Sequence, residues 1–375
     1  MENKTDASAP SVSTQSANLV KNDSAKLDKF VTIDIGSAWT KAFLVGVDSE
    51  NGVSVEKSAR LPTSWGDLAL VSNLLLTKVS TINTPKLFVS HLPEVENLAK
   101  KQGGDYVEEA QAAEFLVRFL KKSDANVTVL DAGASNLKES MKAEDIGKYL
   151  TFQTNAISLE NFFGKKRFKP HILPADTKEL EIEEAFLRAN LANKLSNQNT
   201  NKKITLAVTG GIISGTPRLS RIALLILDIL GPGIVAQLVF DREFFLPSFG
   251  ALLARYKQLQ IGSPGGWLEE LGTFVSLSGK NTVELDWGYS QMQQVELSVG
   301  EISLIPAPAG QKIKLTLFPS KKERTEYDIG GGSLGIVLDA RPKPLELTFG
   351  QAASRKQMGQ WLKELEQAEI NKEAF

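Results

Sequence analysis

The stretch that decides the fold is FVTIDIGSAWTKAFLV, residues 30–45. An apolar strand ends at Asp34, an Asp-x-Gly-Ser turn follows, and a second strand leaves from Thr40. Because a strand follows the turn, the unit is a β-hairpin, whereas a helix there would indicate a dinucleotide site. The N–H groups of residues 35–38 and the hydroxyls of Ser37 and Thr40 suit a phosphate, and Asp34 suits a hydrated Mg²⁺. Taken alone, the segment is equally compatible with an ordinary hairpin that has a polar turn.

A similar strand and turn recur in VTVLDAGASN, residues 127–136. The apolar strand again ends in Asp-x-Gly, here from Asp131 to Gly133. We expect residues 149–154 to return as the antiparallel partner of this strand. The two aspartates, Asp34 and Asp131, then lie on either side of a metal ion and an attacking water, in a cleft between two related lobes.

A third strand, in KITLAVTGGII at residues 203–213, ends at the pair Gly210-Gly211. Glycine has no side chain, so the pair lets an adenosine lie against the backbone. Each of the three turns is a weak signal by itself. In this order they predict a nucleotide site, with the terminal phosphates at the first turn and the second turn facing them across the cleft.

The patterning of the whole chain predicts several distinct parts. Residues near the N-terminus are small and polar and cannot bury enough surface to order themselves. Apolar residues at helical spacing predict a helix at 105–122, and short alternating segments between Gly-rich turns predict strands after residue 260. The parts are a disordered tail at 1–28, a first lobe at 29–125, a second lobe at 126–258, a β-rich domain at 259–349 and a C-terminal helix at 350–375. Trp361, Leu362 and Leu365 form the thin apolar stripe of that last helix.

Composition excludes several classes of function. The chain has 375 residues and a net charge of -1, so no strong field attracts nucleic acid or an anionic membrane. It has no cysteine, which excludes disulfides, thiolate catalysis and cysteine-ligated metals. The longest apolar run, at 222–227, is too short to span a bilayer, and residues 1–28 contain no apolar signal segment. We therefore expect a cytoplasmic protein with no membrane span and no nucleic-acid partner.

Some other polar residues have ordinary structural explanations. His91 and His171 are far apart, and neither has a nucleophile motif around it, so we expect each to satisfy a local hydrogen bond. Asp241 and the pair Asp339 and Arg341 follow buried strands. We expect them to form local ion pairs or turn bonds.

At its three turns the chain resembles the superfamily of actin, the sugar kinases and the heat-shock ATPases. Residues 34–41 look like the first phosphate motif, residues 131–135 like the second, and residues 209–212 like the adenosine motif. The resemblance covers residues 29–255. It implies an α/β fold of the two-lobed actin-like ATPase type, with duplicated ribonuclease H-like domains, followed here by the β-rich domain. It also implies ATP and Mg²⁺ as cofactors.

Within that superfamily the chain is most similar to the glutamate mutase accessory (L) protein family. The similar stretches include LILDILGP at 225–232 and GGSLGIVLDAR at 331–341. This resemblance implies a chaperone-like, ATP-dependent helper of a protein partner, a cobalamin-dependent mutase.

The motif positions give the expected site residues. Nucleotide and phosphate binding falls to Gly36, Ser37, Thr40, Lys41, Gly133, Ser135, Gly210, Gly211 and Ile212. Asp34 and Asp131 hold the Mg²⁺ through water and are the catalytic residues, with Asp131 orienting the attacking water.

The second phosphate motif departs from the pattern of the superfamily. Ala134 stands where a Gly is usual, and no Thr follows, although Ser135 can substitute for its hydroxyl. The extra methyl narrows the approach of a phosphate, so we expect ATP binding with slow hydrolysis in a switch whose closure changes affinity for a partner. Two alternatives stay open. One is a non-enzymatic actin-like scaffold or assembly protein with a degraded ATPase site. The other is a small-molecule kinase, for which no acidic base stands out.

Overall fold

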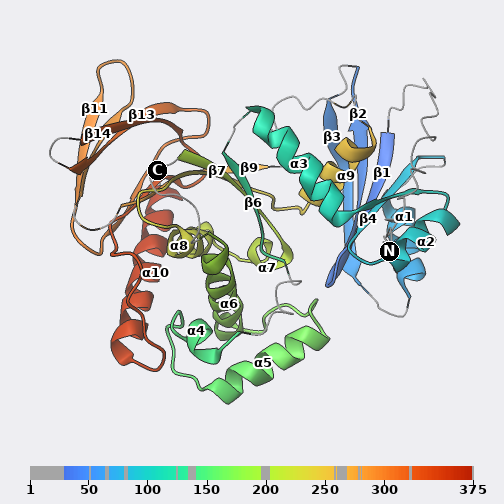
Figure 1. Ribbon diagram of the computed structural model, residues 1–375, viewed down its shortest axis with the longest axis horizontal. Helices are drawn as coiled ribbons and strands as arrows, with labels where there is room; N and C mark the ends of the chain where they lie inside the picture. Colours follow the sequence, from blue (N-terminus) through green and yellow to red (C-terminus); the bar gives the residue numbers. More distant parts are fainter. Residues whose placement is uncertain are drawn as a thin grey trace, which may run out of the picture.

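The computed structural model describes residues 29–49, 52–63, 67–79, 83–123, 126–133, 141–195, 203–256, 259, 268–277, 279, 281–320 and 323–373. Two α/β lobes and a β-rich C-terminal region confirm the expected fold class (Figure 1). The tail predicted at 1–28 and the predicted site residue Ser135 lie outside the described residues. In the described ranges, no helix combines the length and the apolar character needed to cross a membrane.

The first lobe is one mixed sheet in the order β3-β2-β1-β4-β5. Its strands are β1 (Lys29–Ile35), β2 (Trp39–Val47), β3 (Val53–Pro62), β4 (Lys86–Ser90) and β5 (Asp105–Glu108). The first three pair antiparallel, and β4 runs parallel to β1 and to β5. Since successive side chains of a strand point to opposite faces, Val31, Ile33 and Ile35 share one core with α1 (Leu68–Val79) and α2 (Glu94–Lys101). Asp34 belongs to the opposite face.

Two helices, α3 (Glu109–Ser123) and α9 (Leu246–Arg255), form an interlobe layer between the two sheets (Figure 1). One apolar core includes Phe43 of the first sheet, Phe249 of α9 and Ala207 of the second sheet. The layer therefore belongs to both lobes. The boundaries placed at residues 125 and 258 stay a prediction.

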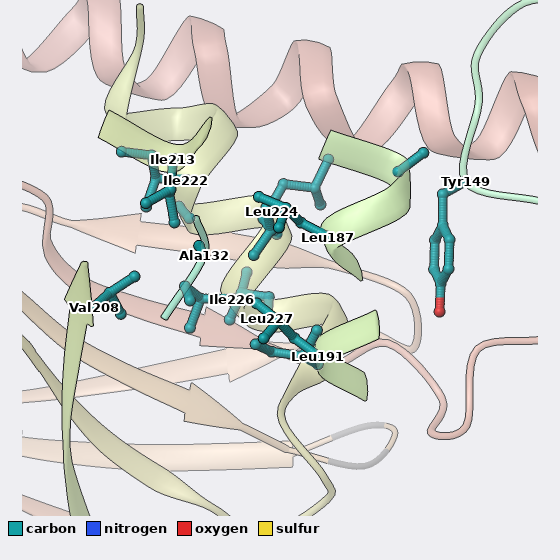
Figure 2. Close-up of a cluster of buried hydrophobic side chains, with 14 of the residues drawn as sticks. Ala132, Tyr149, Leu187, Leu191, Val208, Ile213, Ile222, Leu224, Ile226 and Leu227 are labelled. Carbon is teal, nitrogen blue, oxygen red and sulfur yellow. The ribbon is translucent and has the colours of Figure 1, made fainter. Parts of the chain in front are cut away.

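The second sheet starts with three parallel strands and continues into the β-rich region in the order β12-β15-β9-β8-β7-β6. Its strands are β6 (Val127–Asp131), β7 (Lys203–Thr209), β8 (Val235–Phe240), β9 (Glu269–Ser276), β12 (Ile302–Ile305) and β15 (Gly335–Asp339). Helices α4 (Ala143–Gly147), α5 (Ala156–Phe168), α6 (Thr177–Leu195), α7 (Gly211–Ser214) and α8 (Leu219–Ile229) complete the lobe. Figure 2 shows Leu187 and Leu191 of α6 beside Leu224 and Leu227 of α8 in its core.

The other strands of the β-rich region make a separate antiparallel sheet in the order β11-β10-β13-β14. They are β10 (Asn281–Asp286), β11 (Met292–Leu297), β13 (Lys312–Ser320) and β14 (Glu323–Gly330). A shared core packs this sheet on β9 and β15. The final helix, α10 (Ala352–Glu373), contacts α8 and β12 and buries Trp361 and Leu365 of the predicted stripe, while Leu362 is half-buried.

A buried ion network ties the second sheet to its helices. Arg341, fully buried after β15, donates from Nε to Asp339 at 2.8 Å and from Nη1 to Asp228 of α8 at 2.7 Å. Its guanidinium also lies over the ring of Trp361, 4.6 Å from the centroid. The expected pairing of Asp339 with Arg341 is confirmed, and the network joins β15, α8 and α10.

Two local predictions are wrong. Residues 149–154 form a turn between α4 and α5 and not a strand, so within the described residues β6 pairs only with β7. The helix expected at 105–122 begins only at Glu109, because residues 105–108 form β5. Tyr106 and Val107 fit a helical spacing as well as a strand, and the parallel pairing with β4 decides for the strand.

Candidate functional site

The carboxyl ends of parallel strands from both sheets meet at one cavity of about 160 Å³. In sheets of this kind, ligands bind beyond the carboxyl ends of the strands. Every predicted site residue that the structure describes lines the cavity, with the exception of Thr40. The lining ones are Asp34, Gly36, Ser37, Lys41, Asp131, Gly133, Gly210, Gly211 and Ile212. Their functional roles remain predictions.

The side chains of Asp34 and Lys41 form an ion pair on the floor of the cavity. The two residues are directly opposed in the antiparallel register of β1 and β2, so both point to the same face. Lys41 Nζ lies 2.5 Å from Asp34 Oδ2, and Asp34 is only 2 % exposed. Burial raises the pKa of Asp34 to about 6, the Lys41 ammonium opposes that shift, and the charges of Glu109 and Asp131 add to it.

Thr40 does not face the cavity, contrary to its predicted role as a phosphate ligand. It alternates with Trp39 and Lys41 along β2, and those two side chains take the cavity side. The Thr40 hydroxyl lies 3.0 Å from that of Thr63, which donates to the Gly36 carbonyl at 2.9 Å. Thr40 therefore supports the shape of the first turn from behind.

The two glycines that end β7 have different environments. Gly210 has φ +118°, and a Cβ there would overlap the backbone of Ala132 and Gly133. A Cβ on Gly211 would make ordinary 3.8 Å contacts with the rings of Trp39 and Phe244. The fold itself requires a glycine at position 210, because the backbone of the third turn packs directly against the backbone of the second turn. At Gly211, by contrast, the space that a side chain would occupy is free and belongs to the cavity.

The lining of the cavity is acidic. Its charged side chains are four carboxylates and two ammonium groups, those of Asp34, Glu109, Asp131, Glu183, Lys41 and Lys166. Lys166 of α5 pairs with Glu183 of α6, and both are buried. The charge of the lining would repel a polyphosphate that came without a cation.

Two carboxylates fit a hydrated Mg²⁺ in this lining. Asp34 and Asp131 come from different sheets and face the same cavity, and carboxylate oxygens with several waters are the ligands that Mg²⁺ prefers. Asp131 Oδ1 also accepts a 2.8 Å bond from the Gly133 N–H, which fixes the second turn. In the part of the chain that the structure describes, no group of three His, Asp or Glu side chains is placed to hold a metal directly.

Several lining residues were missed by the sequence analysis. Glu109 starts α3, directly after β5. His91, which directly follows β4, contacts Glu109 from outside the lining. Trp39 shares the parity of Lys41 on β2, so strand alternation was a usable signal for it. Phe244 reaches the cavity through a left-handed backbone conformation, φ +59°, for which the sequence offers no signal.

Asp241 connects the end of β8 to the interlobe layer. It is fully buried and accepts bonds from the N–H groups of Phe245 and Leu246, at 2.9 and 2.8 Å. It also accepts the Thr209 hydroxyl at 2.8 Å, and burial raises its pKa. The expected turn bonds of Asp241 are thus confirmed, and they fix the start of α9 beside the end of β7.

No protein-family model matches the chain, and no curated protein matches it. Solved structures share part of the arrangement at low similarity. An activator of the 2-hydroxyisocaproyl-CoA dehydratase from Clostridium difficile, with bound ADPNP, is 13 % identical over 64 % of this chain and 100 % of its own, with a TM-score of 0.34. A ROK family glucokinase from Streptomyces griseus, in complex with glucose and AMPPNP, is 11 % identical over 60 % and 97 %, at 0.36. The ethanolamine utilization protein EutJ from Carboxydothermus hydrogenoformans is 12 % identical over 60 % and 90 %, at 0.38. At such scores these likenesses carry no weight beside the geometry of the cavity.

Proposed function

We propose that the chain is a nucleotide switch that binds ATP with Mg²⁺ in the cavity, hydrolyses it slowly and thereby changes its affinity for a protein partner. One observation carries the proposal: turns at 34–37, 131–133 and 209–212, from two different sheets, line a single cavity. An ordinary polar hairpin turn has no reason to face two further turns of matching composition.

The proposed roles follow from position in the cavity. The N–H groups of Ser37 and Ala38, which donate no hydrogen bond within the described residues, bind the terminal phosphates together with Lys41. Asp34 and Asp131 hold Mg²⁺ through water, and Asp131 also orients the attacking water. The bound metal supplies positive charge against the phosphates.

The adenosine lies at the third turn. Gly211 and Ile212 line the cavity there, and a Cβ on Gly211 would lie 3.8 Å from an atom of the Trp39 ring and 3.8 Å from an atom of the Phe244 ring. Aromatic rings are the side chains on which a base stacks, and in this structure Arg60 lies over both rings and Lys41 over that of Phe244.

The small size of the cavity supports a switch. Pockets that enclose a drug-sized ligand have about 300–1,000 Å³, against about 160 Å³ here. Lys41 and Lys166 are both engaged in ion pairs with carboxylates. A nucleotide therefore has to open the lobes and exchange these pairs, and a ligand that favours one lobe arrangement shifts the population toward it.

A partner surface lies beside the mouth of the cavity. Ile172 and Leu173 line the cavity and are nevertheless 49 % and 62 % exposed, and Phe168 at the end of α5 is 82 % exposed. Nucleotide-driven opening would reposition these apolar side chains. Following the resemblance to the glutamate mutase accessory (L) family, we propose a cobalamin-dependent mutase as the partner.

The second candidate function is a non-enzymatic scaffold that keeps the fold. The Asp34–Lys41 pair favours it, because this pair already satisfies the charges that a bound Mg²⁺-nucleotide would otherwise satisfy.

Calorimetric titration with Mg²⁺-ATP and a turnover assay on the same sample separate the two. The switch predicts binding that disappears in Asp131→Asn, persists in the exposed control Asp328→Asn, and is accompanied by slow turnover. Ala134→Gly with Asn136→Thr should then raise the basal rate. Absence of any binding signal at millimolar Mg²⁺-ATP would leave the scaffold as the function.

A further inference from the structure

His91 bridges two residues of the cavity lining. Its Nε2 lies 3.3 Å from Ser37 Oγ, and its Nδ1 lies 3.0 Å from Glu109 Oε2. The sequence alone predicts only a local structural hydrogen bond for this histidine. The structure instead places it in a chain of hydroxyl, imidazole and carboxylate.

The topology of the first sheet builds this chain. Ser37 follows β1, His91 follows β4, and Glu109 follows β5, and these three strands are parallel neighbours in the sheet. Their carboxyl ends therefore present the three side chains in the same order. Ser37 and His91 each lie in the turn that follows their strand, and Glu109 is the first residue of α3.

The order of the ring nitrogens is the one that activates a hydroxyl. A Glu109 carboxylate accepts from Nδ1–H, which leaves Nε2 as the acceptor for the Ser37 O–H. The hydrogen bond from His91 lowers the pKa of Glu109, so its carboxyl stays ionised. Nucleophile, base and orienting acid in this arrangement define a nucleophilic site, and the distances are often longer before substrate binds.

The surroundings of Ser37 suit an electrophile with negative charge. Ser37 is 7 % exposed at the first turn, beside the N–H group of Ala38 and near Lys41. A serine that only bound a phosphate would donate its hydroxyl proton to that phosphate and would have no use for a base. Here the base is in place and Glu109 orients it.

We propose that Ser37 is a covalent acceptor of the terminal phosphoryl group of the bound nucleoside triphosphate, with His91 as its general base and Glu109 as the positioning residue. The inference rests on the proposed function. Ser37 Oγ forms a bond to the γ-phosphorus, the bond from the γ-phosphorus to the β,γ-bridging oxygen breaks, and the nucleoside diphosphate leaves with that electron pair. The hydroxyl proton passes to Nε2 of His91.

Phosphorylation would give the switch a covalent state. A phosphoserine carries about −1.5 to −2 charges at neutral pH, and these would compete with Asp34 for Lys41. The state of the cleft would then outlast the departure of the diphosphate.

The test is incubation of the full chain with Mg²⁺-ATP, followed by intact mass measurement and peptide mapping. Binding is measured on the same samples by the thermal shift that Mg²⁺-ATP produces. The variants are Ser37→Ala, His91→Ala and Glu109→Gln. Matched controls are His171→Ala, the other histidine, and Glu108→Gln, the exposed neighbour of Glu109.

We expect one added phosphoryl group, mapped to Ser37, at a rate independent of protein concentration. Ser37→Ala abolishes it, and His91→Ala slows it on the order of a hundredfold while keeping the thermal shift. Added imidazole restores the rate in His91→Ala and not in Ser37→Ala. Glu109→Gln also slows it, and both controls react like the natural chain.

Three results would overturn the inference. A thermal shift with Mg²⁺-ATP but no phosphoserine leaves the proposed function standing and refutes the covalent step. Phosphorylation at another residue refutes the role of Ser37, and an unchanged rate in His91→Ala refutes the base. Absence of the thermal shift as well points to failure of the proposed function itself.

Discussion

Asp34→Asn tests whether the ionised Asp34 carboxylate on the cavity floor lowers the stability of the fold, as expected of a residue kept for ligand binding. An ion pair kept for stability should raise the free energy of unfolding when both partners are charged. Asp34 behaves differently, because its pKa is raised by burial to about 6 in spite of Lys41 at 2.5 Å. The free energy lost by removing the carboxylate from water exceeds the free energy gained from its attraction to Lys41, as is common for buried ion pairs.

The magnitude follows from the pKa. The folded chain holds the Asp34 proton more tightly than the unfolded chain, so this contribution to stability is complete below the unfolded pKa of 3.8 and is lost as pH rises through about 6. A difference of about two pKa units corresponds to roughly 3 kcal/mol at pH 8. An uncharged Asn resembles the protonated carboxyl and does not titrate. Asp34→Asn should therefore match the natural chain at pH 4 and exceed it at pH 8.

The assay is thermal unfolding followed by tryptophan fluorescence between pH 4 and pH 8, without nucleotide. The melting temperature of Asp34→Asn minus that of the natural chain should grow by several degrees as pH rises from 4 to 8. Lys41→Met raises the pKa of Asp34 further, so that variant should lose stability over the same range. A lower stability of Asp34→Asn than of the natural chain at pH 8, or a difference that does not change with pH, would refute a destabilising role of the Asp34 carboxylate.

Three further predictions concern residues around the site and in the core. Gly210→Ala should lower the free energy of unfolding by more than about 2 kcal/mol, because of the positive φ and because the new Cβ would overlap the second turn. Gly211→Ala should leave thermal unfolding unchanged but weaken the ATP binding measured by calorimetry. Arg341→Met removes one of the two cations that pair with each of the buried carboxylates Asp228 and Asp339, which keep Arg188 and Lys343 respectively. The change should cost about 3 kcal/mol in denaturant unfolding, against less than about 1 kcal/mol for the exposed pair broken by Arg242→Met. Thr40→Val should keep the calorimetric affinity for Mg²⁺-ATP, because the hydroxyl faces Thr63; a large loss of affinity would return Thr40 to the binding site.

The first two turns of the site were predictable from the sequence because short apolar strands lead into them. The short apolar runs that end at Asp34 and Asp131 favour strands, and the glycine two residues after each aspartate favours a turn, so both turns are predictable from local rules. The same rules fail at residues 149–154, where an apolar and aromatic segment packs as a turn between α4 and α5. They also fail at Thr40, although alternation along β2 already separates it from Lys41. The position of Thr40 in the motif suggested that its hydroxyl binds the phosphate, whereas the alternation of side chains along β2 puts that hydroxyl on the face away from the cavity.

The chain of Ser37, His91 and Glu109 was beyond prediction for a different reason. Its members are separated by 54 and 18 residues, and no local pattern connects them. What connects them is the parallel order of β1, β4 and β5, and β5 itself was hidden within a helical spacing. Had β5 been recognised, the rule that parallel strands end at one edge would have placed Glu109 next to His91, and His91 next to the first turn. A single four-residue strand thus decides whether this histidine is interpreted as an ordinary core residue or as the base of a reacting serine.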